Sequence, residues 1–253
     1  MKHLMIFTTL LILSFNSFAA EPNWSAYAEV LKSVSQATKN NVKLALVDYR
    51  ALKENGKLEA VYRQLSNFPV KSLSNKEEKL AFYINAYNIL ALKMVLDHWP
   101  IDSIKDVGSL INPVWGKSAG DIDGKTVSLD EIENNILRPM GEPRIHFAIV
   151  CASVSCPDLR NLPYTASGLN TQLNEQVQQF LDNADKGLRI DNNRIQISRI
   201  FDWFEKDFKS VGGVEAFIRR YRADLPKLPL KDDINYDWNV NGITETQSSV
   251  MVN

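Results

Sequence analysis

The strongest hydrophobic pattern in the chain lies between residues 75 and 97 and predicts a long helix. Its apolar positions recur at alternating spacings of four and three, at Leu80, Ile84, Tyr87, Ala91 and Met94. Further apolar residues lie off this stripe, so we expect the helix to be buried on most sides. Ser74 and Glu77 have the spacing of a capping box before the helix, and Trp99 and Pro100 are expected to end it.

Shorter patterns predict the elements around this helix. Helical spacing of apolar residues predicts an amphipathic helix within 24–35, and a capping box at Ser128 and Glu131 predicts another that ends at Pro139. Two hairpins are expected, with turns at 123–124 and 192–193. Further short helices are expected over 173–181, 200–208 and 214–221.

The run from Ile145 to Cys151 is almost continuously apolar and stands between turn-forming residues, which is typical of a central strand. No repeat, long linker or low-complexity stretch divides the chain. We therefore expect one α+β domain over 20–253, with its core at about 75–241. In it, the central buried helix packs on a small mixed or antiparallel sheet with hairpins.

The N-terminal segment has the pattern of a secretory signal. Lys2 precedes the apolar run from Leu4 to Phe15, and small residues stand at the third and first positions before a cut after Ala19. The run is well short of the roughly 20 apolar residues that a membrane span requires. The sequence therefore predicts a signal peptide over 1–19 and a periplasmic or secreted mature chain.

Charge and composition exclude several classes of protein. The chain has 29 Lys and Arg against 30 Asp and Glu, so it lacks the broad cationic field that nucleic-acid binding needs. No later apolar run approaches the length of a membrane span, so none is expected in the mature chain. With 45% hydrophobic residues, the chain is expected to fold without a metal or a cofactor.

Several motifs resemble one protein family, the domain of unknown function 547. They are FYINAYN at 82–88, HFAIVCASVSCP at 146–157, SRIFDWFEKDF at 198–208 and INYDWN at 234–239. The resemblance extends over roughly 80–241. It implies export, because bacterial members often carry a signal peptide, but it implies no reaction, since the name of the family records an unknown activity.

Thiol chemistry is one interpretation of the cysteine motif, because an imidazole can hold a thiol as the reactive thiolate. In a regular strand, however, His146 and Cys151 face opposite sides and lie about 16 Å apart. Cys156 is therefore the candidate nucleophile, with His146 as base and Asp202 or Asn85 as the group that orients it. Alternatively, Cys151 and Cys156 form a disulfide or stay buried and inert. The spacing of these residues matches no zinc motif, so no metal is expected.

A ligand cleft is the other interpretation. Asn85 and Asn88 share a face of the central helix and need hydrogen-bond partners when buried, so His146 is expected to point toward them, together with Tyr83 and Tyr87. Two acids lie close to an indole in the sequence at Asp202, Trp203 and Asp207. Such a group could orient a histidine or bind a sugar or peptide. Two functions follow: a binding or accessory module for a peptide or small ligand, or a thiol-dependent hydrolase or transferase using Cys156 and His146.

Overall fold

The computed structural model describes residues 21–109, 111 and 113–243, so the predicted signal peptide lies outside the described residues. The central helix is α4 (Lys76–His98), and most of its side chains are buried. Its first turn is capped one position later than predicted. The side chain of Asn75, not Ser74, accepts the N–H of Glu78 at 2.8 Å, and the Glu78 carboxylate accepts the N–H of Ser74 at 2.6 Å.

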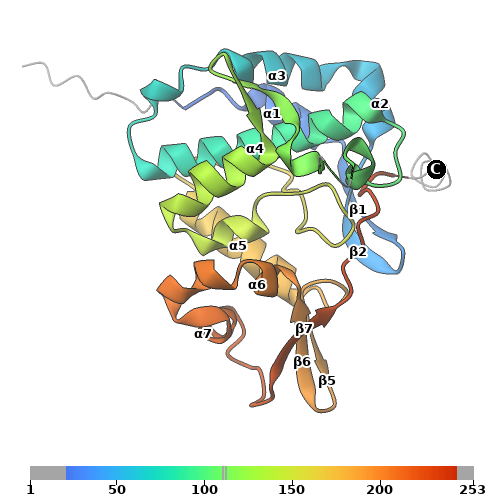
Figure 1. Ribbon diagram of the computed structural model, residues 1–253, viewed down its shortest axis with the longest axis vertical. Coiled ribbons are helices and arrows are strands. Elements are labelled where there is room, and N and C mark those ends of the chain that lie inside the picture. The colour runs from blue at the N-terminus through green and yellow to red at the C-terminus, as the bar shows by residue number, and fades with distance from the viewer. Residues whose placement is uncertain (1–20, 110, 112, 244–253) are drawn as a thin grey trace, which may run out of the picture.

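Elements from the N-terminal part of the chain cover one side of α4 (Figure 1). The helix predicted within 24–35 is shorter than expected, because the chain turns at residues 32–33 and enters a strand. Together these elements and α4 enclose the larger of two main apolar clusters. The elements are α1 (Ser25–Leu31), β1 (Val34–Lys39), β2 (Val42–Val47), α2 (Tyr49–Asn55) and α3 (Lys57–Ser66).

The first predicted hairpin is present as β3 (Ser118–Ile122) and β4 (Lys125–Ser128), an antiparallel pair. Its turn residues Asp123 and Gly124 have φ of +51° and +69°, as a two-residue hairpin turn requires. The helix after it is a π-helix (Glu131–Leu137), and the Ser128 hydroxyl accepts the N–H of Glu131 at 3.0 Å. Such wide turns are rare and occur mostly at functional sites.

The strand predicted over 145–151 is wrong. The chain forms a 3-10 helix (Pro143–Phe147) and then continues without a strand partner. Its backbone is satisfied by a side chain of α4. The Asn88 amide donates to the carbonyl of Ala148 at 2.9 Å and accepts the N–H of Val150 at 2.8 Å. The run is apolar because it is buried against α4, and not because it is a strand of a sheet.

The C-terminal part of the chain forms a second layer below α4 in Figure 1. Strand β6 pairs antiparallel with β5 and parallel with β7, so this sheet is mixed. Phe147 inserts among the phenylalanines of this unit and joins it to the central part. The α+β class predicted from the sequence is confirmed. The elements are α5 (Leu169–Asp182), β5 (Leu188–Asp191), β6 (Arg194–Ser198), α6 (Ile200–Trp203), a 3-10 helix (Glu205–Val211), α7 (Gly213–Tyr221) and β7 (Leu230–Ile234).

After β7 the chain runs back to the N-terminal hairpin formed by β1 and β2. On the way it passes residues 151–156, which contain both cysteines and are called the cysteine loop below. The carbonyl of Asn241 accepts the N–H of Val47 at 2.9 Å, and the carbonyl of Asn239 accepts the N–H of Val154 at 2.8 Å. The N–H of Asn241 donates to the carbonyl of Ala152 at 2.9 Å. Residues 236–243 thus hold the cysteine loop against the N-terminal part of the fold.

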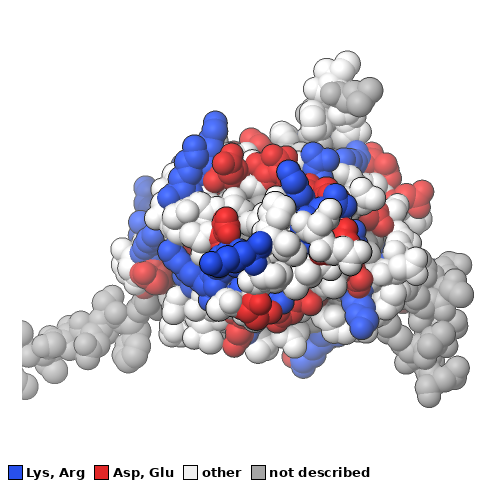
Figure 2. Space-filling view, turned by 90° about the horizontal axis from the view of Figure 1, so that it is seen from below, with Lys and Arg blue, Asp and Glu red and all other residues white. Residues whose placement is uncertain are grey.

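No helix within the described ranges is long and apolar enough to cross a membrane. On the face seen from below, Lys and Arg alternate with Asp and Glu (Figure 2). That face therefore carries no broad patch of a single charge.

We predict that Asn88→Leu lowers the free energy of unfolding by about 2 to 4 kcal/mol, because it leaves a buried carbonyl and a buried N–H unpaired. Lys79→Leu introduces the same residue on the exposed face of the same helix and should change stability by no more than about 0.5 kcal/mol. Urea unfolding of both variants measures the difference. Equal stabilities would show that Asn88 does not organise the 145–151 segment.

Candidate functional site

A cavity of about 250 Å³ lies where α4, the π-helix, the cysteine loop, α6 and the returning C-terminal segment meet. Its polar lining includes Asp130, Glu133 and His146, and both sulfur-bearing residues, Cys151 and Cys156, also line it. Most of the remaining wall is aromatic, formed by Tyr87, Trp115, Trp203, Phe204, Tyr236 and Trp238. An apolar cavity with a few polar groups is the usual form of a small-ligand site.

The aromatic wall is a cluster of mutually packed rings. Trp203 stacks on Trp238 with ring centroids 5.7 Å apart, and Tyr236 contacts both, at 4.8 and 4.5 Å. Trp203 is 41% exposed, so part of its ring surface is accessible. The ammonium of Lys105 lies 3.6 Å from the Trp238 ring centroid, so this ring already takes one cation.

His146 presents one nitrogen without a partner. Its Nε2 lies 2.8 Å from Oδ2 of Asp207, and its ring stacks on Phe204 at 3.9 Å between centroids. Burial lowers the pKa of His146, so the ring is neutral at pH 7, with the proton assigned to Nε2 by its carboxylate partner. Nδ1 then carries a lone pair. It is buried without a hydrogen bond, 3.9 Å from Oε1 of Glu133.

Asp207 holds this arrangement in place. Its carboxylate accepts two hydrogen bonds from Arg138, at 2.6 and 3.0 Å, besides the one from His146. These bonds hold the pKa of Asp207 well below its usual range, so it stays ionised. An ionised carboxylate at Nε2 fixes the tautomer of His146 and directs the lone pair of Nδ1 away from it. His146 can therefore accept a proton from a group in the cavity.

Glu133 is the second group that can exchange a proton near neutral pH. Burial raises its pKa to about 7, while the positive charge of Arg138 opposes the shift and the negative charge of Asp130 adds to it. The hydroxyl of Tyr87 donates to Oε2 at 3.5 Å. Glu133 is thus about half ionised at pH 7 and carries either a proton or a charge into the cavity.

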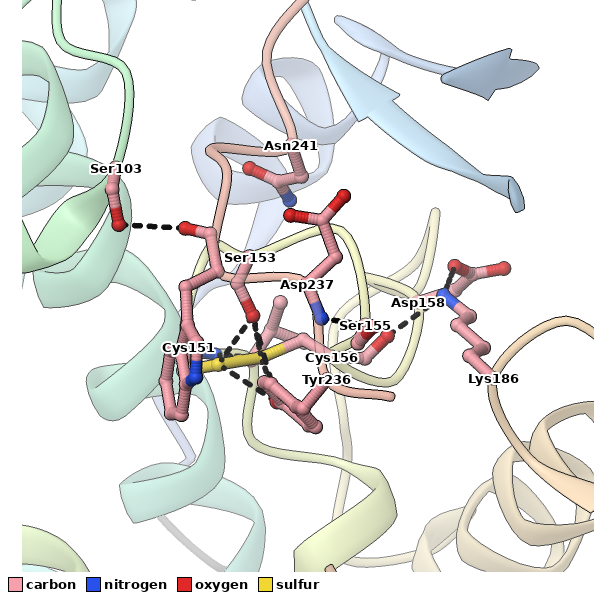
Figure 3. Close-up of a disulfide and its surroundings, with 12 residues drawn as sticks. Ser103, Cys151, Ser153, Ser155, Cys156, Asp158, Lys186, Tyr236, Asp237 and Asn241 are labelled. Atoms are coloured by element: carbon pink, nitrogen blue, oxygen red, sulfur yellow. Dashed lines mark hydrogen bonds and ion pairs between the residues drawn. A yellow bond between two sulfur atoms is a disulfide. The ribbon is translucent and has the colours of Figure 1, made fainter. Parts of the chain in front are cut away.

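Cys151 and Cys156 are joined by a disulfide (Figure 3). Sγ of Cys156 accepts the backbone N–H of Cys151 at 3.0 Å and the hydroxyls of Ser153 and Tyr236 at 3.3 Å each. Neither cysteine is a free thiol, so the structure gives no support to Cys156 as a thiol nucleophile. Among the described residues, no group of three or more His, Cys, Asp or Glu side chains is arranged to hold a metal ion.

The structure brings some of the predicted site residues together and separates others. His146, Tyr87, Trp203 and both cysteines line the cavity. The remaining four lie outside its lining, namely Tyr83, Asn85, Asn88 and Asp202.

The four residues outside have partners of other kinds. The side chain of Asn85 bonds to the backbone of Tyr164, and Asn88 bonds to the 148–150 backbone, so His146 is not their partner. Tyr83 packs edge-on against Phe82. Asp202 is half exposed beside Arg199, at 3.8 Å. The acid that orients His146 is Asp207, not Asp202.

Several residues of the site were not singled out from the sequence, among them Glu133, Arg138 and Tyr236. Glu133 and Arg138 lie in and just after the π-helix, and no local motif distinguishes them from other surface charges. Tyr236 stands in the motif INYDWN, which marks the segment but not the role of its tyrosine.

Residues 70–181 match the family described as "Protein of unknown function, DUF547". Over this segment, which is less than half of the chain, the chain is similar to the DUF547 family. The DUF547 segment contains α4, the π-helix, His146 and both cysteines, whereas Trp203, Asp207 and Tyr236 follow it in the chain. Neither the curated proteins nor the solved structures contain a significant match to this chain.

Replacing Glu133 tests the cost of its burial. Because the pKa rises from 4.5 to about 7, the folded state loses stability as the pH rises between these values, by about 3 kcal/mol at 1.36 kcal/mol per pKa unit. We predict that Glu133→Gln is about 2 kcal/mol more stable than the wild type at pH 8 and nearly equal to it at pH 5. Denaturant unfolding at both pH values measures this.

Glu131→Gln, at an exposed position two residues away, is the matched control. Its free energy of unfolding should change between pH 5 and pH 8 by the same amount as that of the wild type. A Glu133→Gln variant that is less stable than the wild type at pH 8 would contradict the burial of an ionised carboxylate.

Removing the disulfide should weaken the fold without abolishing it. The bond closes a loop with a sequence separation of only 5, for which chain entropy gives about 2 kcal/mol. We predict this loss for the double variant Cys151→Ala/Cys156→Ala, and the same loss for wild-type protein unfolded in the presence of a reductant. Failure of the variant to fold would show that the hydrogen bonds to residues 237–241 cannot hold the loop.

Proposed function

We propose that the chain is an exported domain that binds a small organic ligand or a peptide side chain in the aromatic cavity. The observation that carries this proposal is Nδ1 of His146, a buried acceptor that has no partner and belongs to a residue of the cavity lining. A buried polar atom without a hydrogen bond is costly. A ligand with a donor group in the cavity removes that cost.

The charges around the cavity favour a ligand that carries an ammonium group. Asp130 and Glu133 line it, and none of the lining residues in the described part of the chain is Lys or Arg. Indole and phenol rings also attract cations to their faces. The expected ligand therefore has an apolar or aromatic body and a positively charged donor.

Export is supported by the pattern of residues 1–19, with cleavage after Ala19. An oxidising compartment also suits a disulfide between Cys151 and Cys156. The mass of the mature N-terminus, measured on protein isolated from its own cell, tests this part of the proposal. An intact Met1 in the isolated protein would overturn it.

We predict that benzylamine binds and that benzyl alcohol, of the same shape but uncharged, binds about tenfold more weakly. An ammonium in the cavity stabilises the ionised form of Glu133, whose pKa is about 7 without ligand. Affinity for benzylamine should therefore rise about tenfold from pH 6 to pH 8, with a proton released on binding at pH 6. Isothermal titration calorimetry in two buffers of different ionisation enthalpy measures both quantities.

Two variants locate the binding. Glu133→Gln should remove the pH dependence of the affinity for benzylamine. Trp203→Ala should lower this affinity but leave its pH dependence unchanged. Glu131→Gln, outside the cavity lining, is the control and should bind as the wild type does. If neither benzylamine nor benzyl alcohol binds, the cavity is not a ligand site. If both bind with equal affinity, the preference for a positive charge is overturned.

A further inference from the structure

The disulfide occupies the wall of the cavity instead of the interior of the core. Both cysteines line the cavity, but they differ in access: Cys151 is partly exposed and Cys156 is almost fully buried. Cys151 is therefore the more accessible of the two residues, and its Sγ is the sulfur that we expect an entering thiol to attack. Attack on that sulfur makes Cys156 the leaving group.

The surroundings of Cys156 suit a leaving thiolate. Three donors point at its Sγ: the backbone N–H of Cys151 and the hydroxyls of Ser153 and Tyr236. Figure 3 shows both hydroxyl groups beside the sulfur–sulfur bond. Hydrogen bonds to the thiolate lower its basicity, and a less basic thiol leaves faster. Sγ of Cys151 has contacts to the two hydroxyls but no backbone donor among the described contacts.

A proton acceptor for the incoming thiol lines the same cavity. Nδ1 of His146 is unprotonated and unpaired, and Asp207 fixes the proton on the opposite nitrogen. Only the thiolate form attacks a disulfide, so a base in the lining of the same cavity increases the reactive fraction.

The cysteine loop stays in place without the bond. Residues 152–155 are tied to residues 237–241 by three backbone hydrogen bonds and by one from the N–H of Asp237 to the Ser155 hydroxyl, all of 2.8 to 3.2 Å. Within the loop, Ala152 has φ of +59°, a left-handed conformation that a non-glycine residue adopts at some cost. Because the returning segment holds this shape, the two sulfurs remain adjacent after reduction and can pair again.

We propose that this cavity carries out thiol–disulfide exchange with small or peptide thiols that bear a positive charge. The inference rests on the proposed function, since the thiol occupies the same acidic, aromatic cavity. In the first step the S–H proton passes to Nδ1 of His146, and the substrate sulfur bonds to Sγ of Cys151. The Cys151–Cys156 bond breaks, and Cys156 leaves as a thiolate that takes the proton back.

In the second step another substrate thiol gives its proton to Nδ1 of His146, and its sulfur attacks the substrate sulfur of the mixed disulfide. Cys151 leaves as a thiolate and takes this proton. Two substrate thiols are thereby oxidised to one disulfide, and the Cys151–Cys156 pair gains two electrons and two protons. A further cycle requires an external low-molecular-weight disulfide, which accepts the two electrons and reoxidises the pair.

The test compares three thiols, cysteamine (positive), 2-mercaptoethanol (neutral) and mercaptoacetate (negative), under anaerobic conditions. Alkylation and mass spectrometry follow reduction of the disulfide in the native protein and in the same protein unfolded in urea. The ratio of the two rates removes the intrinsic reactivity of each thiol. We expect a ratio of about ten or more for cysteamine and a smaller one for mercaptoacetate.

Variants separate the roles of the residues. His146→Gln should lower the native rate about a hundredfold and weaken its dependence on pH, whereas the exposed His98→Gln should leave it unchanged. Tyr236→Phe should slow the release of Cys156. In Cys156→Ser the mixed disulfide between cysteamine and Cys151 should form from cystamine and persist, because no resolving thiol remains.

The outcomes distinguish this inference from the proposed function. If benzylamine binds but the native disulfide reacts more slowly than the unfolded one, the bond is only structural and the exchange is overturned while ligand binding stands. If the native rate is fast but equal for all three thiols, the acidic cavity is not the exchange site and the substrate class is overturned. Fast exchange that prefers cysteamine and that benzylamine inhibits supports both.

Discussion

The carboxylate of Asp207 is the interaction on which the site depends, because it accepts hydrogen bonds from His146 and from Arg138 at once. Asp207 lies in the C-terminal part of the chain, whereas its two partners come from the turn 143–147 and the end of the π-helix. Three separate segments are thereby fixed around one cavity. Since the ion pair with Arg138 keeps Asp207 charged, the proton of His146 stays on the side away from the cavity.

Three unfavourable features lie at or beside this cavity, whereas the buried side chains of Asn85, Asn88 and Lys186 have partners. Nδ1 of His146 lacks a hydrogen bond, Glu133 is buried with a raised pKa, and Ala152 has a left-handed backbone. Each lowers stability, and folded proteins retain such costs chiefly where function needs them. Among these costs, the unpaired Nδ1 of His146 is a hydrogen-bond acceptor without a partner on a residue of the cavity lining, so it carries the proposed function.

Local signals predicted the local structure well. The spacing of apolar residues gave α4 nearly to its ends, and the Asp123–Gly124 turn gave the first hairpin, because neighbours in the sequence determine both. The strand over 145–151 was wrong because a side chain, Asn88, replaces the neighbouring strand as hydrogen-bond partner. The spacing of apolar residues in a sequence does not show whether a side chain or a neighbouring strand bonds to the backbone.

The site was predictable only in part, for a similar reason. The cysteine motif and Trp203 stand out in the sequence, but choosing Asp207 over Asp202 requires knowing which turn of the 200–211 segment faces His146. Glu133 carries no signal at all, since its raised pKa arises from burial and from charges that the fold brings near it. Chemistry that depends on long-range packing is visible only in three dimensions.

Nitrogen-15 NMR of the His146 ring tests most directly whether Asp207 presents an unprotonated nitrogen to the cavity. At pH 7 and above the spectrum should show one protonated nitrogen, Nε2, and one unprotonated nitrogen, Nδ1, and Asp207→Asn should disturb this pattern. A ring that is doubly protonated at pH 7, or one whose proton exchanges between both nitrogens, would contradict it.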